Sequence, residues 1–293
     1  MSGHITIDAA KCTNCMRCVE VCFLNFEDDG NGRARVTGRP DACFACGHCA
    51  AVCPPGAIAN SRLGSLGFSP LSAQPAVSND ALLGLLSGRR SRREFKDEPV
   101  SRETIDKLTL AAAQAPNGIN RRNVHYTVIT DRGTLQAMSR RVAAQTARLA
   151  AILRRPLGRL FFRLFFRSAY RELEPLLPLL DLMDGARAAG KDIILYGAPC
   201  AILVHTPESD GATGCEDAVY AASNILAAAE TLGLGACVIG FITGSIRGDS
   251  QLRRLAQLSA DRRVHTTIII GHPRFGYARA IARPLPPVHA IAA

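Results

Sequence analysis

The chain has 293 residues, 47% of them hydrophobic, with a formal net charge of +10 at pH 7. This length accommodates two domains, one of them with a sizeable core. No run approaches the roughly eighteen uninterrupted apolar residues of a membrane span. The first residues, Met1-Ser2-Gly3-His4, lack the apolar stretch of a secretory signal. We therefore expect neither a membrane-spanning helix nor export.

The positive charge is concentrated in one part of the sequence. Residues 1–62 carry six Lys/Arg and six Asp/Glu, whereas nine arginines and no acidic residue lie between Gly133 and Arg171. Charge confined to one segment indicates a single basic surface and argues against general nucleic-acid binding.

Two copies of one cysteine spacing stand at the start of the chain. Each copy reads C-x2-C-x2-C-x3-C, over residues 12–22 and 43–53. This is the bacterial spacing for two iron–sulfur cubanes, in which the fourth cysteine of each run binds the other cluster. The predicted ligand sets are Cys12, Cys15, Cys18 and Cys53 for one 4Fe-4S cluster, and Cys43, Cys46, Cys49 and Cys22 for the other.

Zinc and disulfides are the alternatives for this cysteine pattern. Zinc takes four ligands, usually in paired C-x2-C groups, and leaves the fourth cysteine of each run unexplained. Iron–sulfur is therefore favoured, and the segment resembles two-cluster bacterial ferredoxins, except that Phe23 rather than proline follows Cys22. Thiolate ligands without an export signal predict a cytoplasmic location. The remaining cysteines are predicted to be buried core thiols: Cys200, Cys215 and Cys237.

The cysteine runs define the first domain, residues 1–62, with short strands expected at Ile5–Ile7 and Ala34–Val36. Residues 63–80 are rich in Gly, Ser and Pro and are predicted to be a linker. Residues 81–293 are predicted to form one α/β unit. Helices are expected over 101–114 (with Ser101 as N-cap), 133–154 and 216–232, and strands over 124–130, 200–206, 236–239 and 264–271.

Three segments of this unit are suited to hold a phosphate and a flat ring. In the first, residues 88–95, arginines surround Ser91. Guanidinium forks and a hydroxyl suit a phosphate ester, although a solvated basic face is the commoner origin of such a run. The second, Ala-Pro-Asn-Gly-Ile-Asn at 115–120, offers amides and Asn side chains to ring carbonyls and nitrogens. Its alternative is an ordinary helix-to-strand turn.

The third segment, residues 232–241, contains glycines that let the backbone approach a cofactor closely. It is not a dinucleotide fingerprint, because the spacing G-x-G-x4-G is wrong and the segment follows a helix rather than a strand.

In this order, the three segments resemble motifs of the FMN-dependent nitroreductase family: R-x-S-x-R/K-x-F, A-P-S/T-G-x-N and G-L-G-x-C-x-I-G. The preceding helix, with Asp217 and Asn224, and the tail from Gly271-His272-Pro273 onward also fit. The resemblance covers residues 81–293. With the cysteine domain, the whole chain resembles the ferredoxin–nitroreductase fusions.

This resemblance implies an α+β fold: a two-cluster ferredoxin-like domain, then a nitroreductase-like α/β/α sandwich with a mostly antiparallel sheet. It also implies a homodimer with FMN at the interface. The FMN phosphate and ribityl chain are expected at Arg89, Arg90, Ser91 and Arg93, helped by Arg279 or Arg283. The flavin ring is expected at Pro116, Asn117, Gly118 and Asn120, with Asn120 reaching across the dimer, and at Ile239 and Gly240.

The sequence departs from the family at two places. Arg122-Asn123-Val124 replaces the common Gln-Pro-Trp, and Val238 replaces a frequent aromatic residue. Arg122 beside the ring would stabilise an anionic reduced flavin, and Val238 would leave a wider pocket.

A basic and apolar stretch follows residue 154. Arginines recur every four residues beside a broad apolar face, at Arg159, Arg163, Arg167 and Arg171 with Phe161, Phe162, Phe165 and Phe166 between them. The favoured interpretation is an apolar face packed on the body with solvated arginines. The alternatives are docking of an acidic partner, such as a loaded ferredoxin, or lying in a membrane interface.

The implied function is an iron–sulfur flavoprotein oxidoreductase. Electrons would pass from the two clusters to FMN and on to an electron-poor organic acceptor: a nitro compound, a quinone or an activated alkene. The alternatives are an electron-transfer or redox-sensing module, or another flavin reaction such as reductive dehalogenation. The donor would be a ferredoxin or NAD(P)H. Because the cofactor carries the chemistry, no general acid or base is assigned, and neither His125 nor Tyr126 is expected to be catalytic.

Overall fold

The chain divides into two compact units in the computed structural model, which describes residues 4–37, 42–64, 67–69, 71, 77–281 and 283–291. The cysteine unit comprises Met1–Ala76 and Asn117–Arg122, and the sheet unit comprises Val77–Pro116 and Asn123–Ala293. Much of the predicted linker 63–80 lies outside the described residues. The turn 117–122, expected with the flavin-binding part of the chain, groups instead with the cysteine unit.

The cysteine unit contains two short antiparallel strand pairs and two short helices. Strand β1 (Ile5–Ile7) pairs with β4 (Ile58–Asn60), and β2 (Phe26–Asp28) pairs with β3 (Ala34–Val36). The helices are α1 (Arg17–Val21) and α2 (His48–Val52). In its buried core cluster, three of the six residues are cysteines, at Cys18, Cys43 and Cys49. A core this small depends on what its thiols bind.

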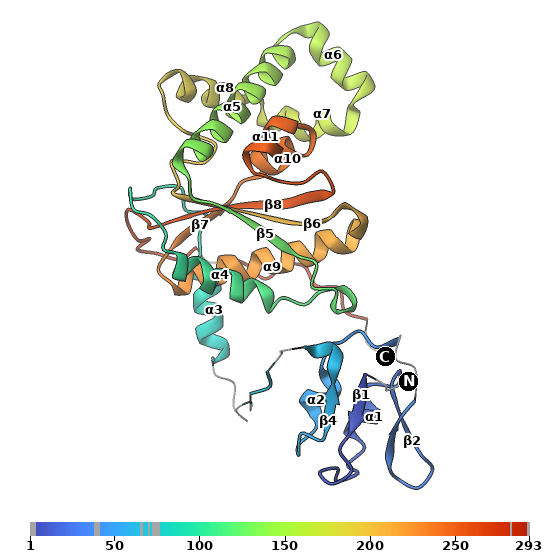
Figure 1. Cartoon of the computed structure of the whole chain (residues 1–293). Coiled ribbons are helices and arrows are strands. Elements are labelled where there is room, and N and C mark those ends of the chain that lie inside the picture. The colour runs from blue at the N-terminus through green and yellow to red at the C-terminus, as the bar shows by residue number, and fades with distance from the viewer. Residues whose placement is uncertain are drawn as a thin grey trace. The chain divides into compact units, whose positions relative to one another are not determined.

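A four-stranded antiparallel sheet forms the centre of the sheet unit (Figure 1). The strand order is β5 (His125–Ile129), β6 (Cys200–Pro207), β8 (Arg262–Gly271) and β7 (Gly235–Val238). Every pairing among these strands is antiparallel. The predicted antiparallel sheet is therefore confirmed.

Helices cover both faces of this sheet (Figure 1). On one face, α4 (Arg102–Ala113) and α9 (Gly211–Thr231) pack against Ile202 and Val204. On the other, α5 (Arg132–Arg154), α10 (Gly240–Gly248) and α11 (Ser250–Leu255) pack against Ala201 and Leu203. Successive strand side chains point to opposite faces. Burial on both faces explains why β6 is apolar almost throughout.

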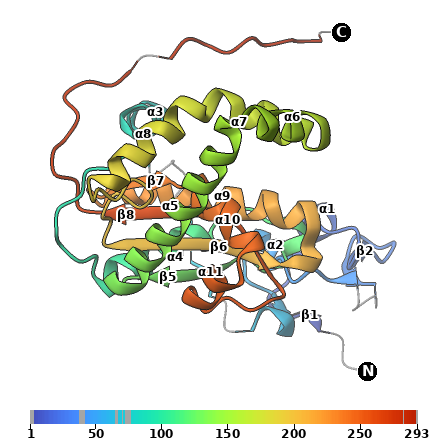
Figure 2. The ribbon, with the colours of Figure 1, turned by 90° about the horizontal axis from the view of Figure 1, so that it is seen from above.

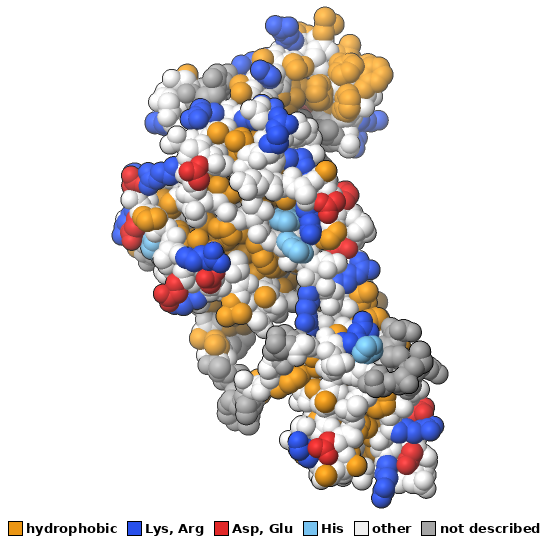
Figure 3. Space-filling view, in the orientation of Figure 1, with side chains coloured by type: hydrophobic (Ala, Val, Ile, Leu, Met, Phe, Trp, Pro, Cys, Tyr) orange, Lys and Arg blue, Asp and Glu red, His pale blue; other side chains and the backbone are white. Residues whose placement is uncertain are grey.

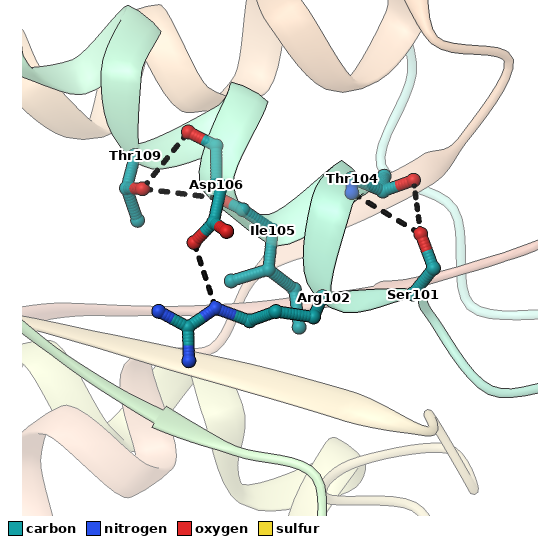
Figure 4. A network of polar contacts seen from close by, with 6 residues as sticks. All are labelled: Ser101, Arg102, Thr104, Ile105, Asp106 and Thr109. Carbon is teal, nitrogen blue, oxygen red and sulfur yellow. Dashed lines mark hydrogen bonds and ion pairs between the residues drawn. The ribbon is translucent and has the colours of Figure 1, made fainter.

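Side-chain caps start several helices at the positions that the sequence favours. Ser101 caps α4: its Oγ accepts from the Thr104 backbone N at 3.1 Å and donates to Thr104 Oγ1 at 2.9 Å (Figure 4). Arg102 adds an ion pair with Asp106 at 2.8 Å, one turn along the same helix. A cap of this kind contributes about 0.5–2 kcal/mol. The predicted cap is confirmed.

Helix α9 begins at Gly211, five residues before the predicted start, and ends at Thr231. Gly233 follows with φ +68, the left-handed conformation that commonly stops a helix. Cys215 is exposed on this helix, so its predicted burial is wrong. Gly214, the preceding residue, is on the buried side of the helix, so the side chain of Cys215 points away from the sheet. Cys200 and Cys237 are buried as predicted, and burial raises the pKa of the Cys200 thiol to about 12.

The basic and apolar stretch forms α6 (Pro156–Phe165) and α7 (Arg167–Leu173), followed by α8 (Leu177–Ala188). The apolar side chains of α6 gather on the surface (Figure 3), and Leu157, Leu164 and Phe165 are 81%, 66% and 70% exposed. The favoured expectation that this face packs on the body is therefore wrong for the protomer. The phenyl rings contact one another instead, with Phe161 and Phe165 centroids 5.1 Å apart.

Among the described residues, no helix is both long enough and apolar enough to cross a membrane. Helix α3 (Asn79–Gly88) leads into the first predicted phosphate segment. Its N-cap is Ser78, whose side chain accepts from the Ala81 backbone N at 3.2 Å.

Candidate functional site

The first predicted ligand set lines one cavity of the cysteine unit. All four of its cysteines belong to the lining, together with apolar residues including Ile7 and Ile58. The set is Cys12, Cys15, Cys18 and Cys53. A backbone hydrogen bond from Arg17 lowers the pKa of exposed Cys15. Cys53, from the second run, therefore lies beside the three cysteines of the first run, as the crossed assignment requires. The four residues fit a 4Fe-4S cluster.

The second ligand set gathers around Cys49. Burial raises the pKa of this thiol to about 11, and nearby thiols add to the rise: Cys22, Cys46 and Cys43. Proximity to Cys22 places the fourth cysteine of the first run beside the second run. Amide donors reach these sulfurs, since the side chains of Asn60 and Asn25 lie 3.4 and 3.8 Å from the sulfurs of Cys43 and Cys22. Such donors suit thiolates, so this set also fits a cluster.

No group of three or more His, Cys, Asp or Glu in the described part of the chain is arranged to hold a metal ion as a single centre. That arrangement needs ligands that converge on one point, as around zinc. In a cubane each thiolate binds a different iron, so its ligands stand further apart.

In the sheet unit, the first and third predicted segments lie side by side. Ser91 pairs with Ala236 of β7 through a parallel bridge. The backbone N of Arg92 donates to the Ala236 carbonyl at 3.0 Å. The arginine-rich segment therefore extends along the free edge of β7.

Alternation along this extended segment separates the arginines into two roles. Arg92 is buried, and its guanidinium donates to the Phe275 carbonyl at 2.9 Å, lies 3.7 Å from Glu230 and stacks over Tyr277. Ser91 and Arg93 are exposed on the opposite side, and Arg89 and Arg90 are half-exposed. The four predicted phosphate residues thus remain available, while Arg92 holds the segment in place.

The chain after β8 flanks the other side of the same segment. Phe95 bridges Pro273, Lys96 N donates to the His272 carbonyl at 2.8 Å, and Arg274 N donates to the Glu94 carbonyl at 3.0 Å. The C-terminal part of the chain runs out as an extended arm (Figure 2). Arg279 and Arg283 are exposed on this arm. Within the described residues, no hydrogen bond or ion pair joins either of them to residues 88–95.

Two glycines of the third segment have different reasons to be glycine. A Cβ on Gly235 would lie 2.9 Å from Arg92 Cβ, so this glycine allows the first segment to approach β7. A Cβ on Gly240 would meet nothing within 4 Å, and Gly240 is exposed at the start of α10. Only the second matches the predicted role of leaving room for a ligand. Ile239 is buried, and its backbone N donates to the Thr267 carbonyl at 2.8 Å.

The second predicted segment is divided between the units. Pro116 belongs to the sheet unit, whereas Asn117, Gly118 and Asn120 belong to the cysteine unit. There the Asn120 side chain donates to the carbonyls of Phe44 at 3.1 Å and Ala45 at 2.7 Å.

Arg122 also donates to the Ala45 carbonyl, at 3.2 Å. The sequence predicts Arg122 beside the flavin ring and does not predict its contact with the cysteine unit. No local pattern signals this contact, because its partners stand 77 residues apart.

The turn before β6 contains residues that sequence reasoning missed. Tyr196 adopts a left-handed backbone with φ +57, and the Arg93 guanidinium lies 5.6 Å from the centre of its ring. Asp192 holds the turn, accepting from the backbone N of Ile194, Leu195 and Gly197. Aspartate is a common turn residue because its carboxylate can bond following backbone amides. Asp192 was therefore a signal in the sequence for a turn at this point.

Comparisons with known proteins identify both parts of the chain. Residues 86–272 match the model of the nitroreductase family, and residues 11–58 match the model of a 4Fe-4S dicluster domain. The FMN reductase (NAD(P)H) of Bacillus subtilis strain 168 is 28% identical over 189 residues, which are 64% of this chain and 64% of that relative. The match therefore spans just under two thirds of the relative's length.

Solved structures share the fold of the sheet unit. A nitroreductase with bound FMN from Bacteroides fragilis superposes with a TM-score of 0.53 at 17% identity, covering 74% of this chain and all of that one. A nitroreductase with bound FMN from Desulfitobacterium hafniense gives a TM-score of 0.51 at 20% identity, covering 73% of this chain and all of that one. The chain belongs to the nitroreductase family and carries a 4Fe-4S dicluster domain before its nitroreductase fold.

Proposed function

We propose that the protein passes electrons from two 4Fe-4S clusters to FMN and from FMN to an electron-poor organic acceptor. The acceptor class is a nitro compound, a quinone or an activated alkene. Family membership makes the chain an FMN-dependent oxidoreductase with iron–sulfur clusters. The observation that carries the finer proposal is the pairing of the arginine-rich segment with β7, which brings two family motifs together.

The clusters and FMN would supply one-electron and two-electron transfer, respectively. The chain's own residues bind and orient these groups. The guanidinium groups of Arg89, Arg90 and Arg93 and the Ser91 hydroxyl provide fork donors for a phosphate ester. In the described residues, no acidic side chain pairs with these three arginines, so their charge is available to an anion.

Other residues are proposed for the flavin ring. Gly240 opens helix α10 at an exposed position with free space around it. The start of a helix carries partial positive charge, which favours an electron-rich group nearby. Ile239, immediately before it, supplies an apolar neighbour. The resemblance assigns Pro116, Asn117, Gly118 and Asn120 to the ring edge and Arg279 or Arg283 to the phosphate.

Assembly and location complete the proposal. We propose a cytoplasmic homodimer with the flavin at its subunit interface, as the family resemblance implies. The electron donor is either a reduced ferredoxin or NAD(P)H. The B. subtilis relative's name specifies NAD(P)H for that protein. The presence of a dicluster domain in this chain supports a one-electron donor instead.

Anaerobic purification with measurement of flavin, iron and sulfide provides the first test. Stopped-flow absorbance would then follow flavin reduction by NADH, by NADPH and by reduced ferredoxin. We expect reduction through the clusters to be fast in the wild type and lost in a Cys53→Ser variant that still binds flavin. A protein without flavin, or flavin reduction by ferredoxin at an unchanged rate in this variant, would contradict the proposal.

A further inference from the structure

The two cysteine loops have nearly the same backbone. We define the first loop as residues 12–15 and the second as residues 43–46. Asn14 and Ala45 occupy matching positions, and both adopt a left-handed backbone, with φ +52 and +50. A helix follows each loop, and each holds the third cysteine of its run. The two loops therefore present a similar backbone to the two predicted clusters, although backbone amides also reach Cys15 and Cys53 of the first set.

The turn 117–122 breaks this equivalence inside the cysteine unit. The Asn120 side chain donates to the carbonyls of Phe44 and Ala45, and the Arg122 guanidinium donates to that of Ala45. Among the described residues, no hydrogen bond reaches the corresponding carbonyls of the first loop, those of Thr13 and Asn14. Within the part of the chain that the structure describes, the second loop alone receives a guanidinium and a side-chain amide from a distant segment.

These contacts continue through one peptide group to a ligand sulfur. Asn120 donates to the carbonyl of Phe44. The same peptide group carries the N–H of Ala45, which donates to the sulfur of Cys43 at 3.4 Å. Hydrogen bonds in such a chain polarise and strengthen one another. The amide of Asn120 thereby acts on a thiolate that it does not touch.

Buried side-chain amides add to the same asymmetry. Asn60, 9% exposed, donates to the sulfur of Cys43, and Asn25, 2% exposed, donates to that of Cys22. Both sulfurs belong to the second predicted ligand set. Hydrogen bonds to sulfur and nearby positive charge stabilise the reduced, more negative state of a cluster and so raise its reduction potential.

We propose that Asn120 and Arg122 are positioning residues that raise the reduction potential of the second cluster above that of the first. The second cluster is the one predicted at Cys22, Cys43, Cys46 and Cys49. A single electron shared by the pair then rests on the second cluster, with one cluster reduced, the other oxidised and no proton or bond exchanged. The inference deepens the proposed function, on whose iron–sulfur clusters it rests.

The turn is also continuous in sequence with the sheet unit, since its chain neighbours are Pro116 and Asn123. The residues that would tune the second cluster therefore belong to the segment that links it by sequence to the family's flavin motif.

Redox titration of the loaded full-length protein, followed by electron paramagnetic resonance, tests the proposal. We expect Arg122→Gln and Asn120→Ala each to lower one midpoint potential and leave the other unchanged. A tenfold change in the distribution of the electron corresponds to about 59 mV for a one-electron couple. Arg122→Lys, which keeps the charge, should restore part of the shift.

Arg17→Gln is the matched control, because Arg17 is an exposed cation beside Cys15 of the first ligand set. It should lower the other midpoint potential, and so identify which signal belongs to which cluster. Iron and sulfide content checks that each variant is loaded. If Asn120→Ala fails to load, Arg122→Gln, at an exposed residue, carries the test.

The proposal is overturned if neither midpoint moves in the Arg122 and Asn120 variants, or if the potential that moves is the one that Arg17→Gln lowers. The titration needs neither flavin nor acceptor. Failure of flavin reduction would therefore count against the proposed function and leave this result intact.

Discussion

Ser91 and Ala236 form a parallel bridge that joins the arginine-rich segment to the free edge of β7. They stand far apart in the sequence, and each belongs to a different motif of the family. The bridge fixes the register of the segment, so that Arg92 points inward and Ser91 and Arg93 point outward. The consequences of this register can be measured.

Removing one of the arginines predicted to bind the phosphate should weaken flavin binding. We expect Arg90→Ala and Arg93→Ala each to cost about 1.5–3 kcal/mol of binding free energy, the usual contribution of hydrogen bonds to a charged group. That corresponds to roughly a tenfold to hundredfold rise in the dissociation constant. Flavin fluorescence titration of the flavin-depleted protein measures it.

Lys96→Ala is the control for these arginine variants, because Lys96 is an exposed cation directly after this segment. Its structural contact is through the backbone, to the His272 carbonyl, and survives the substitution. An equal loss of affinity in this variant would show that general positive charge, rather than the motif, binds the flavin.

Adding a methyl group at Gly235 should displace the segment. Its Cβ would stand 2.9 Å from Arg92 Cβ and 3.3 Å from a ring carbon of Phe95. Overpacking of this kind costs about 1–3 kcal/mol of unfolding free energy. We expect Gly235→Ala to lower thermal stability and release flavin while keeping its iron, as measured by calorimetry and metal analysis.

Gly244→Ala is the matched control for Gly235→Ala, because Gly244 lies within α10 and a Cβ there meets nothing within 4 Å. An alanine in a helix interior is favoured over glycine by roughly 0.5–1 kcal/mol. Unchanged stability in Gly235→Ala, with or without a gain in Gly244→Ala, would contradict the packing argument.

The crossed assignment of cysteines predicts which cysteine variants lose the same cluster signal. Cys22 lies in the first run, but its thiol is close to Cys49 of the second. We expect Cys22→Ser and Cys49→Ser to alter the same cluster, and Cys22→Ser and Cys18→Ser to alter different ones. Electron paramagnetic resonance of the reduced proteins shows which signal survives. A shared signature for Cys22→Ser and Cys18→Ser would contradict the crossing.

Acid should loosen the pairing of β5 with β6. Burial, with Arg262 and His125 adding to it, lowers the pKa of His205 to about 4, whereas Asp261 opposes the shift. An unfolded histidine titrates near 6.5, so the unfolded state binds more protons between about pH 6.5 and 4. The stabilisation is fully present above pH 6.5 and is lost as the pH falls, with a magnitude on the order of 2–3 kcal/mol.

Hydrogen exchange of the β5 and β6 amides between pH 6.5 and 4.5 measures this loss in the sheet itself. The readout separates it from acid damage to the clusters. His205→Gln should flatten the pH dependence, although it also changes the contact between His205 Nε2 and Thr127 Oγ1. An equally steep dependence in the variant would assign the effect to other groups.

Local sequence signals predicted much of the architecture. Ser101 caps its helix, Gly233 ends α9, and the apolar runs at 200–206 and 264–271 become β6 and β8. The cysteine spacing predicted the crossed sets, because a fixed cluster geometry demands that spacing. These features depend on neighbours in the chain or on a rigid ligand.

Features that depend on distant residues were less predictable. Arginine is usually exposed, yet Arg92 is buried because its guanidinium donates to the Phe275 carbonyl and pairs with Glu230. The bonds of Asn120 and Arg122 to the second loop follow from tertiary folding, which no periodicity encodes. The expectation that the apolar face of α6 packs on the body was wrong for a different reason. Amphipathic spacing shows that a helix has an apolar face, but not what covers it.

The stability of the cysteine unit depends on the same thiols that are predicted to bind its clusters. Three of the six residues in its buried core cluster are thiols, so oxygen or peroxide that strips iron from the protein would remove bonds that hold the domain together. Loss of the clusters would then unfold the cysteine unit as well as end electron transfer. Exposure to air should therefore make this unit susceptible to proteases while the nitroreductase fold, with its own larger apolar interior, stays intact.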